Sequence, residues 1–115
     1  MPLVDVTYDR SVSDGELQLL ASHLPEVVAE AVQCPEEPWT GPPELGDLEI
    51  RFHARDAHDV GALRIVVEVR TKLFASRVGD KERRADLMRD RLSQLDLGPL
   101  GVWLILHDGA WSQTS

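Results

Sequence analysis

The sequence predicts an α/β (α+β) fold in which two β-α-β units form a four-stranded sheet with two helices on one face. Four short segments alternate apolar and polar residues, as half-buried strands do, and two longer segments repeat apolar residues at helical spacing. The order is strand, helix, strand, and then the same again. Right-handed crossovers place both helices on one face. A chain of 115 residues fits one domain, 1–115, with pseudo-repeat halves at about 1–56 and 61–115.

The first half begins with a strand at 3–8 and continues with a helix. Ser13 is followed three residues later by Glu16, a capping box that satisfies free amides at a helix N-terminus. Pro25 lies within the helical pattern and is expected to kink the helix or break a turn. Residues 34–47 carry four prolines and two glycines and predict a loop. The apolar stripe of the helix is formed by Leu17, Leu20, Leu24, Val27, Val28 and Ala31.

The remaining elements follow from the same patterns. Gly79-Asp80 is expected to begin the second helix, and Gly98-Pro99 to end it. A turn at 56–61 separates the halves. Three further strands are predicted, at 48–55, 63–71 and 102–107. The strand at 63–71 has the strongest alternation: Leu63, Ile65, Val67 and Val69 on one side, and Arg64, Val66, Glu68 and Arg70 on the other.

The sheet face opposite the helices is predicted to be polar. In a monomer this face would be solvated, which is usual for a two-layer sandwich. In an oligomer the same face could line a polar central channel, and the sequence leaves both interpretations open. The polar side chains on this face are Asp5, Thr7, Glu49, Arg51, His53, Arg64, Glu68 and Arg70.

The formal net charge of −8 argues against nucleic acid as the main partner. Residues 1–50 hold eleven acidic side chains and one basic one, whereas residues 51–115 hold nine acidic and eleven basic ones. An anionic ligand is therefore expected at the second half or at Arg10. The single cysteine, Cys34, predicts a reducing, cytoplasmic location. The sequence has neither a run of eighteen apolar residues nor a signal-peptide pattern, so no membrane partner is expected.

Common cofactor and catalytic motifs are absent from the sequence. It has no Gly-x-Gly-x-x-Gly, no Walker loop and no Gly-x-Ser-x-Gly, so nucleotide binding and serine hydrolysis are not predicted. Two histidines and two aspartates within 53–59 carry metal-ligating side chains, but their spacing fits no standard site and no metal is expected. Cys34 is expected to be a small buried apolar residue rather than a nucleophile.

Pro2, directly after the initiator methionine, is the candidate catalytic residue. A small second residue usually allows the methionine to be removed, which would leave a secondary amine at the N-terminus. The ordinary pKa of an α-amino group is about 7.7–8.0, and burial lowers it because desolvation disfavours the cation. Such an amine could act as a neutral general base near physiological pH. If Met1 is retained, the Pro2 nitrogen is an amide and this hypothesis fails.

The run from Pro2 to Tyr8, a short loop holding Arg10, a capped helix and a duplicated β-α-β pattern together resemble the tautomerase superfamily. The resemblance covers nearly the whole chain, although the loop at 34–47 fits poorly. The long single-chain forms are the most similar: the 5-carboxymethyl-2-hydroxymuconate isomerase, malonate semialdehyde decarboxylase and macrophage migration inhibitory factor groups. The Cys-x-x-Cys of the last group is absent.

The resemblance implies roles for particular residues. Pro2 would move a proton between carbons of a keto-enol or dienol acid. Arg51 would bind the substrate carboxylate, and Arg70 with Lys72 would match the paired basic residues that follow this strand in the decarboxylase and dehalogenase groups. Arg10 lies near, but not at, the position of the family's loop arginine. An alternative for Arg51 and Arg70 is cross-strand pairing with neighbouring glutamates.

The resemblance also implies an assembly and a substrate class. Trp111 would form a hydrophobic wall in a neighbouring subunit's pocket, or would alternatively cap the fold. The protein would be a homotrimer, would need no cofactor, and would act on a small anionic organic acid. Two other hypotheses stay open: decarboxylation or hydration at the same site with Pro2 as general acid, and a non-catalytic ferredoxin-like binding or regulatory domain.

Overall fold

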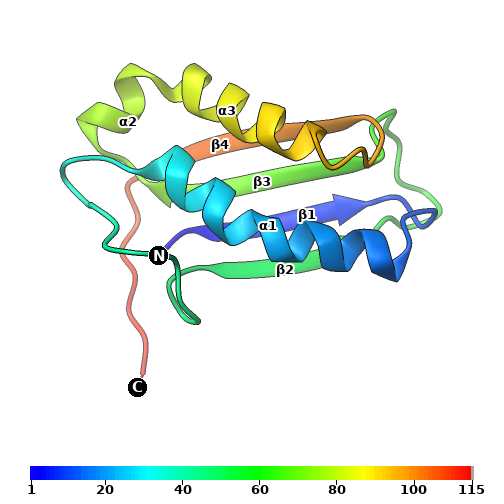
Figure 1. Cartoon of the computed structure of the whole chain (residues 1–115), viewed down its shortest axis with the longest axis horizontal. Helices are drawn as coiled ribbons and strands as arrows, with labels where there is room; N and C mark the ends of the chain where they lie inside the picture. The colour runs from blue at the N-terminus through cyan, green and yellow to red at the C-terminus, as the bar shows by residue number, and fades with distance from the viewer. Residues whose placement is uncertain (115) are drawn as a thin grey trace.

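The computed structural model describes residues 1–114, and its four strands form one sheet in the order β2-β1-β3-β4 (Figure 1). The outer pairs, β1 with β2 and β3 with β4, are parallel, and the central pair, β1 with β3, is antiparallel. Two β-α-β units therefore meet at the centre of the sheet, which confirms the predicted fold class. The strands are β1 (Leu3–Tyr8), β2 (Glu49–Ala54), β3 (Ile65–Lys72) and β4 (Leu100–His107).

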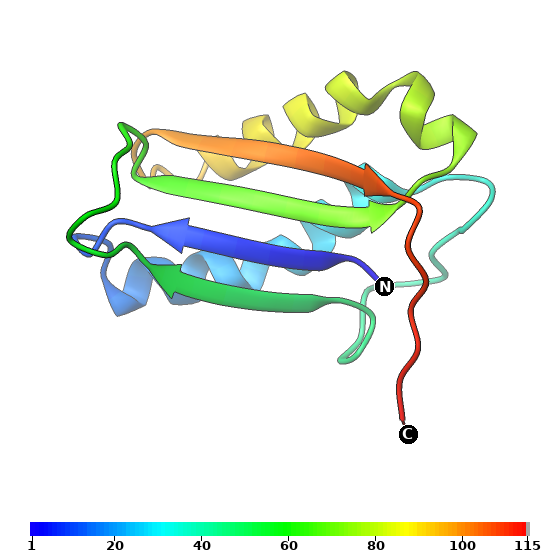
Figure 2. The ribbon, with the colours of Figure 1, turned by 180° about the vertical axis from the view of Figure 1, so that it is seen from behind.

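All helices cover the same face of the sheet, as the right-handed crossovers predict, and Figure 2 shows the opposite face without any helix in front of it. The first unit contains α1 (Asp14–Val32), and the second contains α2 (Ala75–Gly79) and α3 (Lys81–Ser93). The core lies between the helices and the sheet. Its fully buried members include Val4, Val6, Leu20, Leu24, Val28, Ile65, Val67, Val69, Met88 and Leu92.

Helix α1 begins at the predicted capping box: Ser13 Oγ accepts a hydrogen bond from the Glu16 amide at 3.2 Å, and the Glu16 carboxylate accepts one from the Ser13 amide at 3.1 Å. The helix continues through Pro25, so the expectation of a broken turn is wrong. Proline removes one helical hydrogen bond, but the buried residues on both sides of it, Leu24 and Val27, pack into the core and hold the helix.

Helix α3 begins directly after Gly79-Asp80, as predicted, but the second helical region differs from the prediction in an additional short helix before it and in its C-terminal end. A short helix, α2, precedes the predicted start, and α3 ends at Ser93, before Gly98-Pro99. Asp80 is the N-cap of α3 but does not cap it with its side chain, since its carboxylate instead accepts hydrogen bonds from Arg83 at 2.7 Å and Arg84 at 2.5 Å. Charged hydrogen bonds to two arginines replace the weaker bond to a backbone amide.

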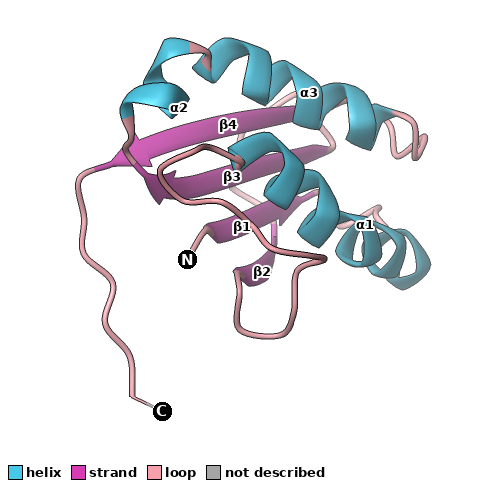
Figure 3. Cartoon of the chain, turned by 60° about the vertical axis from the view of Figure 1, so that its left-hand side comes forward, coloured by secondary structure: helices cyan, strands magenta, loops and turns pink. Residues whose placement is uncertain are grey.

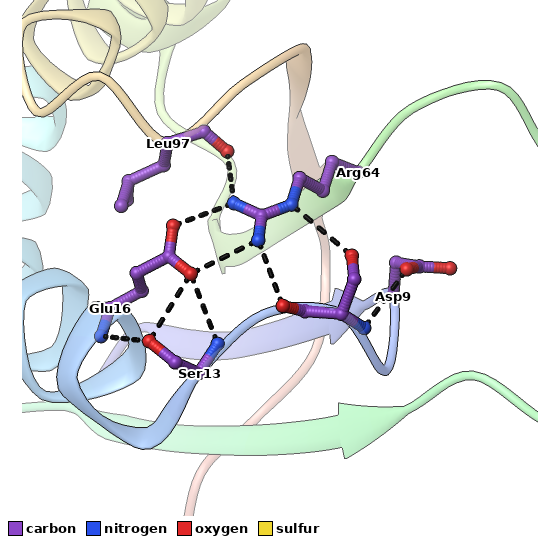
Figure 4. A network of polar contacts seen from close by, with 6 residues as sticks. Asp9, Ser13, Glu16, Arg64 and Leu97 are labelled. Atoms are coloured by element: carbon purple, nitrogen blue, oxygen red, sulfur yellow. Dashed lines mark hydrogen bonds and ion pairs between the residues drawn. The ribbon is translucent and has the colours of Figure 1, made fainter.

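The alternation predicted for 63–71 fails at its first two residues. The amides of Arg64 and Ile65 both donate to the Pro99 carbonyl, at 2.8 and 3.3 Å, as at a β-bulge. Because a bulge inserts one extra residue, the side chains before it point to the opposite faces of the sheet from those that the alternation predicts. Leu63 is therefore exposed, and the Arg64 guanidinium bonds Glu16 and the Leu97 carbonyl on the helix-bearing side (Figure 4). Arg64 is therefore not a member of the polar sheet face, and that expectation is wrong.

Two further features of residues 1–114 bear on the sequence interpretation. Cys34 is buried, with 3% of its surface exposed, as expected for a small apolar side chain. None of the helices in this range has the length and apolar character that crossing a membrane requires.

Candidate active site

Pro2 is buried and lies directly before β1, at the end of the sheet where β3 and β4 finish. Its carbonyl accepts a hydrogen bond from the Glu49 amide at 3.0 Å, which ties it to β2. Leu3 pairs with Arg70 in the antiparallel register, and continuing this register places Pro2 opposite Thr71 and Met1 opposite Lys72. The topology thus brings the N-terminus beside the basic end of β3.

A cavity of about 360 Å³ opens at this place. Side chains from both ends of the sequence meet there, because the segment after β4 crosses the end of the sheet next to the N-terminus (Figures 1 and 3). The cavity is lined by Met1, Leu3, Glu37, Lys72, His107, Gly109, Ala110 and Trp111. One anionic, one cationic and one imidazole side chain therefore surround an apolar floor beside Pro2.

Lys72 and Trp111 are the two sequence-predicted binding residues that line this cavity. Lys72 is the last residue of β3, and its ammonium lies 5.5 Å from the centre of the Phe74 ring. Trp111 is 54% exposed, and its indole N–H donates to Gln113 Oε1 at 2.8 Å. The indole thus lies on the extended segment after β4, with about half of its surface free for a further contact.

Arg51 and Arg70 meet on the open sheet face, at the carboxylate of Asp5. Asp5 lies 3.6 Å from Arg51 Nε and 3.2 Å from Arg70 Nη1, and it also contacts His53 Nε2 at 2.7 Å. Arg70 makes a second ion pair with Glu68, at 3.4 Å. Neither arginine lines the cavity beside Pro2 within one chain. Their guanidinium groups are engaged by carboxylates in this state.

Arg10 lies at the opposite end of β1 from Pro2, and its Nε donates to the Arg55 carbonyl at 2.8 Å. Six strand residues separate the two sites, which corresponds to about 20 Å. A single chain does not bring Arg10 to the cavity.

The structure adds two cavity residues that sequence reasoning missed, Glu37 and His107. Glu37 lies in the proline-rich loop, where no periodic pattern indicates its position. Its carboxylate accepts a hydrogen bond from the buried Arg77 at 3.2 Å. His107 ends β4 in register with Lys72, and its position follows only from the strand pairing.

The His107 ring is held by the backbone amide of Gly109, two residues further along the chain. The Gly109 amide donates to His107 Nδ1 at 3.0 Å, so this nitrogen carries no proton. In the neutral ring the proton is then on Nε2, which makes His107 a hydrogen-bond donor beside Lys72. A side chain at Gly109 would crowd this arrangement, because a Cβ there would lie 2.6 Å from Nδ1.

The polar side chains that line the cavity are one carboxylate, one ammonium and one imidazole, from Glu37, Lys72 and His107. Within residues 1–114, no cluster of three or more His, Cys, Asp or Glu side chains is arranged to hold a metal ion. Lys72 and His107 supply N–H donors at the cavity, and such donors form strong hydrogen bonds with charged oxygens. Nearby, the hydrogen bond from Ser76 lowers the pKa of Glu36 and keeps this loop carboxylate charged.

Comparison with known proteins identifies the fold. No family model and no curated protein matches the sequence. Among solved structures, a macrophage migration inhibitory factor-like protein from Entamoeba histolytica has a TM-score of 0.61 and 11% identity, covering 98% of this chain and 95% of its own. FG41 malonate semialdehyde decarboxylase, inhibited by 3-bromopropiolate, has a TM-score of 0.65 and 14% identity, covering 98% and 91%.

A third similar structure is a fused 4-OT that forms a symmetric trimer, with a TM-score of 0.53 and 19% identity over 92% of this chain and 85% of its own. These proteins match the superfamily that the sequence resembles, over nearly the full chain. The protein therefore has the tautomerase-superfamily fold.

Proposed function

We propose that the protein is a tautomerase-like isomerase in which Pro2, once Met1 is removed, is the general base for keto-enol or dienol proton transfer. The substrate is a small unsaturated oxo or hydroxy acid. The observation that carries the proposal is the position of Pro2, a buried residue beside a cavity lined by Met1, Lys72, His107 and Trp111. Removal of Met1 places the Pro2 amine at this cavity, where apolar neighbours such as Trp111 disfavour the cationic form, and the neutral amine can accept a carbon-bound proton.

The cationic side chains suit the charge that forms during this reaction. Removing a proton next to a carbonyl creates an enolate, and fixed N–H donors stabilise it. Lys72 and His107 are donors at the cavity itself. Arg70 and Arg51 are proposed to bind the substrate carboxylate after leaving Asp5, and Trp111 to exclude water. Arg10 is proposed to contribute from a neighbouring subunit, since it lies far from Pro2 in its own chain. No cofactor is required.

A second reaction at the same site, decarboxylation or hydration, is favoured by Glu37. Hydration needs a base that accepts a proton from water, and a carboxylate beside the cavity is such a base. Protonated Pro2 would then act as general acid. Product analysis by NMR separates this reaction from isomerisation.

The assembly is proposed to be a homotrimer in the cytoplasm. The sheet face without helices carries Trp103, 65% exposed, and the strands β2 and β4 form the open edges of the sheet. Light scattering on a sizing column measures the assembly. Trp103→Lys should dissociate it, whereas Trp111→Lys, at the other exposed tryptophan, should reduce activity more than assembly. A monomeric wild type contradicts the trimer.

The test of the activity starts with the intact mass of the purified protein. A mass that lacks one methionine leaves Pro2 as the N-terminus, and a full-length mass rules the mechanism out. The mature protein is then assayed on phenylenolpyruvate and 2-hydroxymuconate. Pro2→Ala should lower kcat by about 100-fold or more, the size of a general-base contribution. Pro35→Ala, at a proline in the exposed loop, is the matched control and should retain activity.

An inactive wild type would contradict the isomerase. Formation of a decarboxylated or hydrated product would then support the second reaction. If Pro2→Ala has no effect on any of these reactions, the non-catalytic ferredoxin-like domain is the better hypothesis.

A further inference from the structure

Arg77 is a buried side chain that joins three segments around the charged end of the cavity. It belongs to α2 and has 0% of its surface exposed. Its Nε donates to the carbonyl of Val32 at 2.8 Å, its Nη1 to the carbonyl of Lys72 at 2.9 Å, and its Nη2 to Glu37 Oε1 at 3.2 Å. One guanidinium thus connects the last residue of α1, the last residue of β3 and the proline-rich loop.

The partners of Arg77 are fixed groups, because a guanidinium removed from water needs well-placed acceptors. The carbonyl of Val32 is one of the unpaired carbonyls at a helix C-terminus, where the helix dipole favours a cation. The Phe74 ring centre lies 5.2 Å from the guanidinium carbon and covers it. The loop has a second attachment to α2, where the Ser76 amide donates to Glu36 at 3.2 Å.

Two of the three hydrogen-bond partners of Arg77, Lys72 and Glu37, also line the cavity beside Pro2. Arg77 holds Lys72 by its backbone carbonyl and so does not occupy the ammonium, which lies 5.5 Å from the centre of the Phe74 ring. It holds Glu37 by its carboxylate, which keeps that carboxylate from turning toward the ammonium. A Lys72–Glu37 ion pair would neutralise the cation that an anionic substrate needs.

We propose that Arg77 is a positioning residue that keeps the Glu37 carboxylate apart from the Lys72 ammonium, so that Lys72 stays available to the anionic substrate. This inference rests on the proposed function, since the separation affects turnover only if an anionic acid enters the cavity.

Arg84 provides a matched control, because it is a second buried arginine at the same end of α1. It is 8% exposed, and its Nη1 donates to the carbonyls of Ala31 at 2.9 Å and Gln33 at 2.6 Å. Its Nε donates to Asp80. None of these partners lines the cavity beside Pro2. Substitutions at Arg84 therefore measure the structural cost of losing a buried guanidinium.

The experiment compares Arg77→Lys with Arg84→Lys in the mature protein, by Tm and by kcat and KM on phenylenolpyruvate. Lysine keeps the charge but cannot bond all three acceptors, since it lacks the planar fork. Both variants should lose a similar amount of Tm. Only Arg77→Lys should raise KM, by about tenfold, with a smaller change in kcat.

A second substitution that lowers the raised KM of Arg77→Lys distinguishes a positioning role from a purely structural one. Glu37→Gln added to Arg77→Lys removes the competing carboxylate charge, so KM should fall at least about threefold relative to Arg77→Lys alone, the scale of one weakened ion pair. The same addition to Arg84→Lys should not lower KM. If Arg77→Lys does not fold, Phe74→Leu loosens the guanidinium and should raise KM. Because the same ring lies 5.5 Å from the Lys72 ammonium, this rise supports Arg77 only if the addition of Glu37→Gln reverses it. An unchanged KM in that variant overturns the proposal.

Binding of maleate, a dicarboxylate, measures affinity for an organic anion without requiring turnover. It therefore separates this inference from the proposed function. Weaker maleate binding in Arg77→Lys than in Arg84→Lys, with an inactive wild type, supports Arg77 and contradicts the isomerase. If Arg77→Lys and Arg84→Lys are both active and have equal KM values, the positioning role of Arg77 is contradicted and the isomerase proposal is unaffected. A wild type that neither turns over phenylenolpyruvate nor binds maleate overturns both.

Discussion

Arg64, directly before β3, and Glu16, in the first turn of α1, form a bidentate ion pair, with Nη1–Oε2 at 2.7 Å and Nη2–Oε1 at 3.0 Å (Figure 4). The same guanidinium donates to the carbonyls of Ser11 and Leu97, both at 3.0 Å. One side chain therefore connects the two β-α-β units at the end of the sheet away from Pro2. This end is a structural clamp, whereas the other end carries the cavity.

The clamp predicts a particular acid sensitivity. The hydrogen bond from Arg64 lowers the pKa of Glu16 from its ordinary value of 4.5 to about 2. A carboxyl whose pKa is lowered by folding stabilises the protein fully above 4.5, and this stabilisation is lost as the pH falls from 4.5 toward 2. In urea unfolding, wild type should therefore lose more stability over this interval than Glu16→Gln.

Glu82→Gln is the control for the clamp. Glu82 is also acidic and in the first turn of a helix, but it makes none of the ion pairs found in residues 1–114. Its substitution should leave the acid dependence of wild type intact. Equal pH dependence of wild type and Glu16→Gln would contradict the role of the clamp.

Thr71 carries a buried hydroxyl whose oxygen has no hydrogen-bond partner among residues 1–114. A buried unpaired hydroxyl costs stability, so Thr71→Val, which replaces it with a methyl of similar shape, should raise the free energy of unfolding by about 1 kcal/mol. Urea unfolding of the form that retains Met1 measures this change. A loss of stability would show that the hydroxyl is bonded in solution.

The pairing of Arg70 with Asp5 predicts opposite effects for the two partners. If Arg70 binds the substrate carboxylate, Arg70→Ala should raise KM by about tenfold. Asp5→Asn should lower KM, because it releases Arg70 and Arg51 from a competing carboxylate. Steady-state kinetics on the mature protein measures both. Unchanged KM in Arg70→Ala and in Arg51→Ala would remove these arginines from the site.

Gly109→Ala tests the role of His107. The new Cβ would lie 2.6 Å from His107 Nδ1, so the ring must turn out of its present position. Because His107 is exposed, the free energy of unfolding should change by less than about 0.5 kcal/mol, as for most surface substitutions. KM should nevertheless rise, by about as much as in His107→Phe, which lacks the ring N–H. A wild-type KM in Gly109→Ala would show that His107 does not contact the substrate.

Local patterns determined most of the fold. Alternation fixed β1 at its observed bounds, and the Ser13–Glu16 capping box placed the start of α1, because both signals depend on neighbours within a few residues. They failed at Pro25, where burial of the helix outweighed the lost hydrogen bond. They failed again at Arg64, where pairing with Glu16, 48 residues away, decided the side-chain direction.

The sequence by itself determined the strand-helix order and the class of fold, and it pointed to Pro2 as the candidate catalytic residue. Only the tertiary structure decided which charged residues surround that proline. Lys72 faces the cavity while Arg51 and Arg70 pair with Asp5, and Glu37 and His107 arrive from a loop and an edge strand. The physical reason is that a cavity between chain ends depends on strand register and long-range hydrogen bonds, which leave no periodic trace in the sequence.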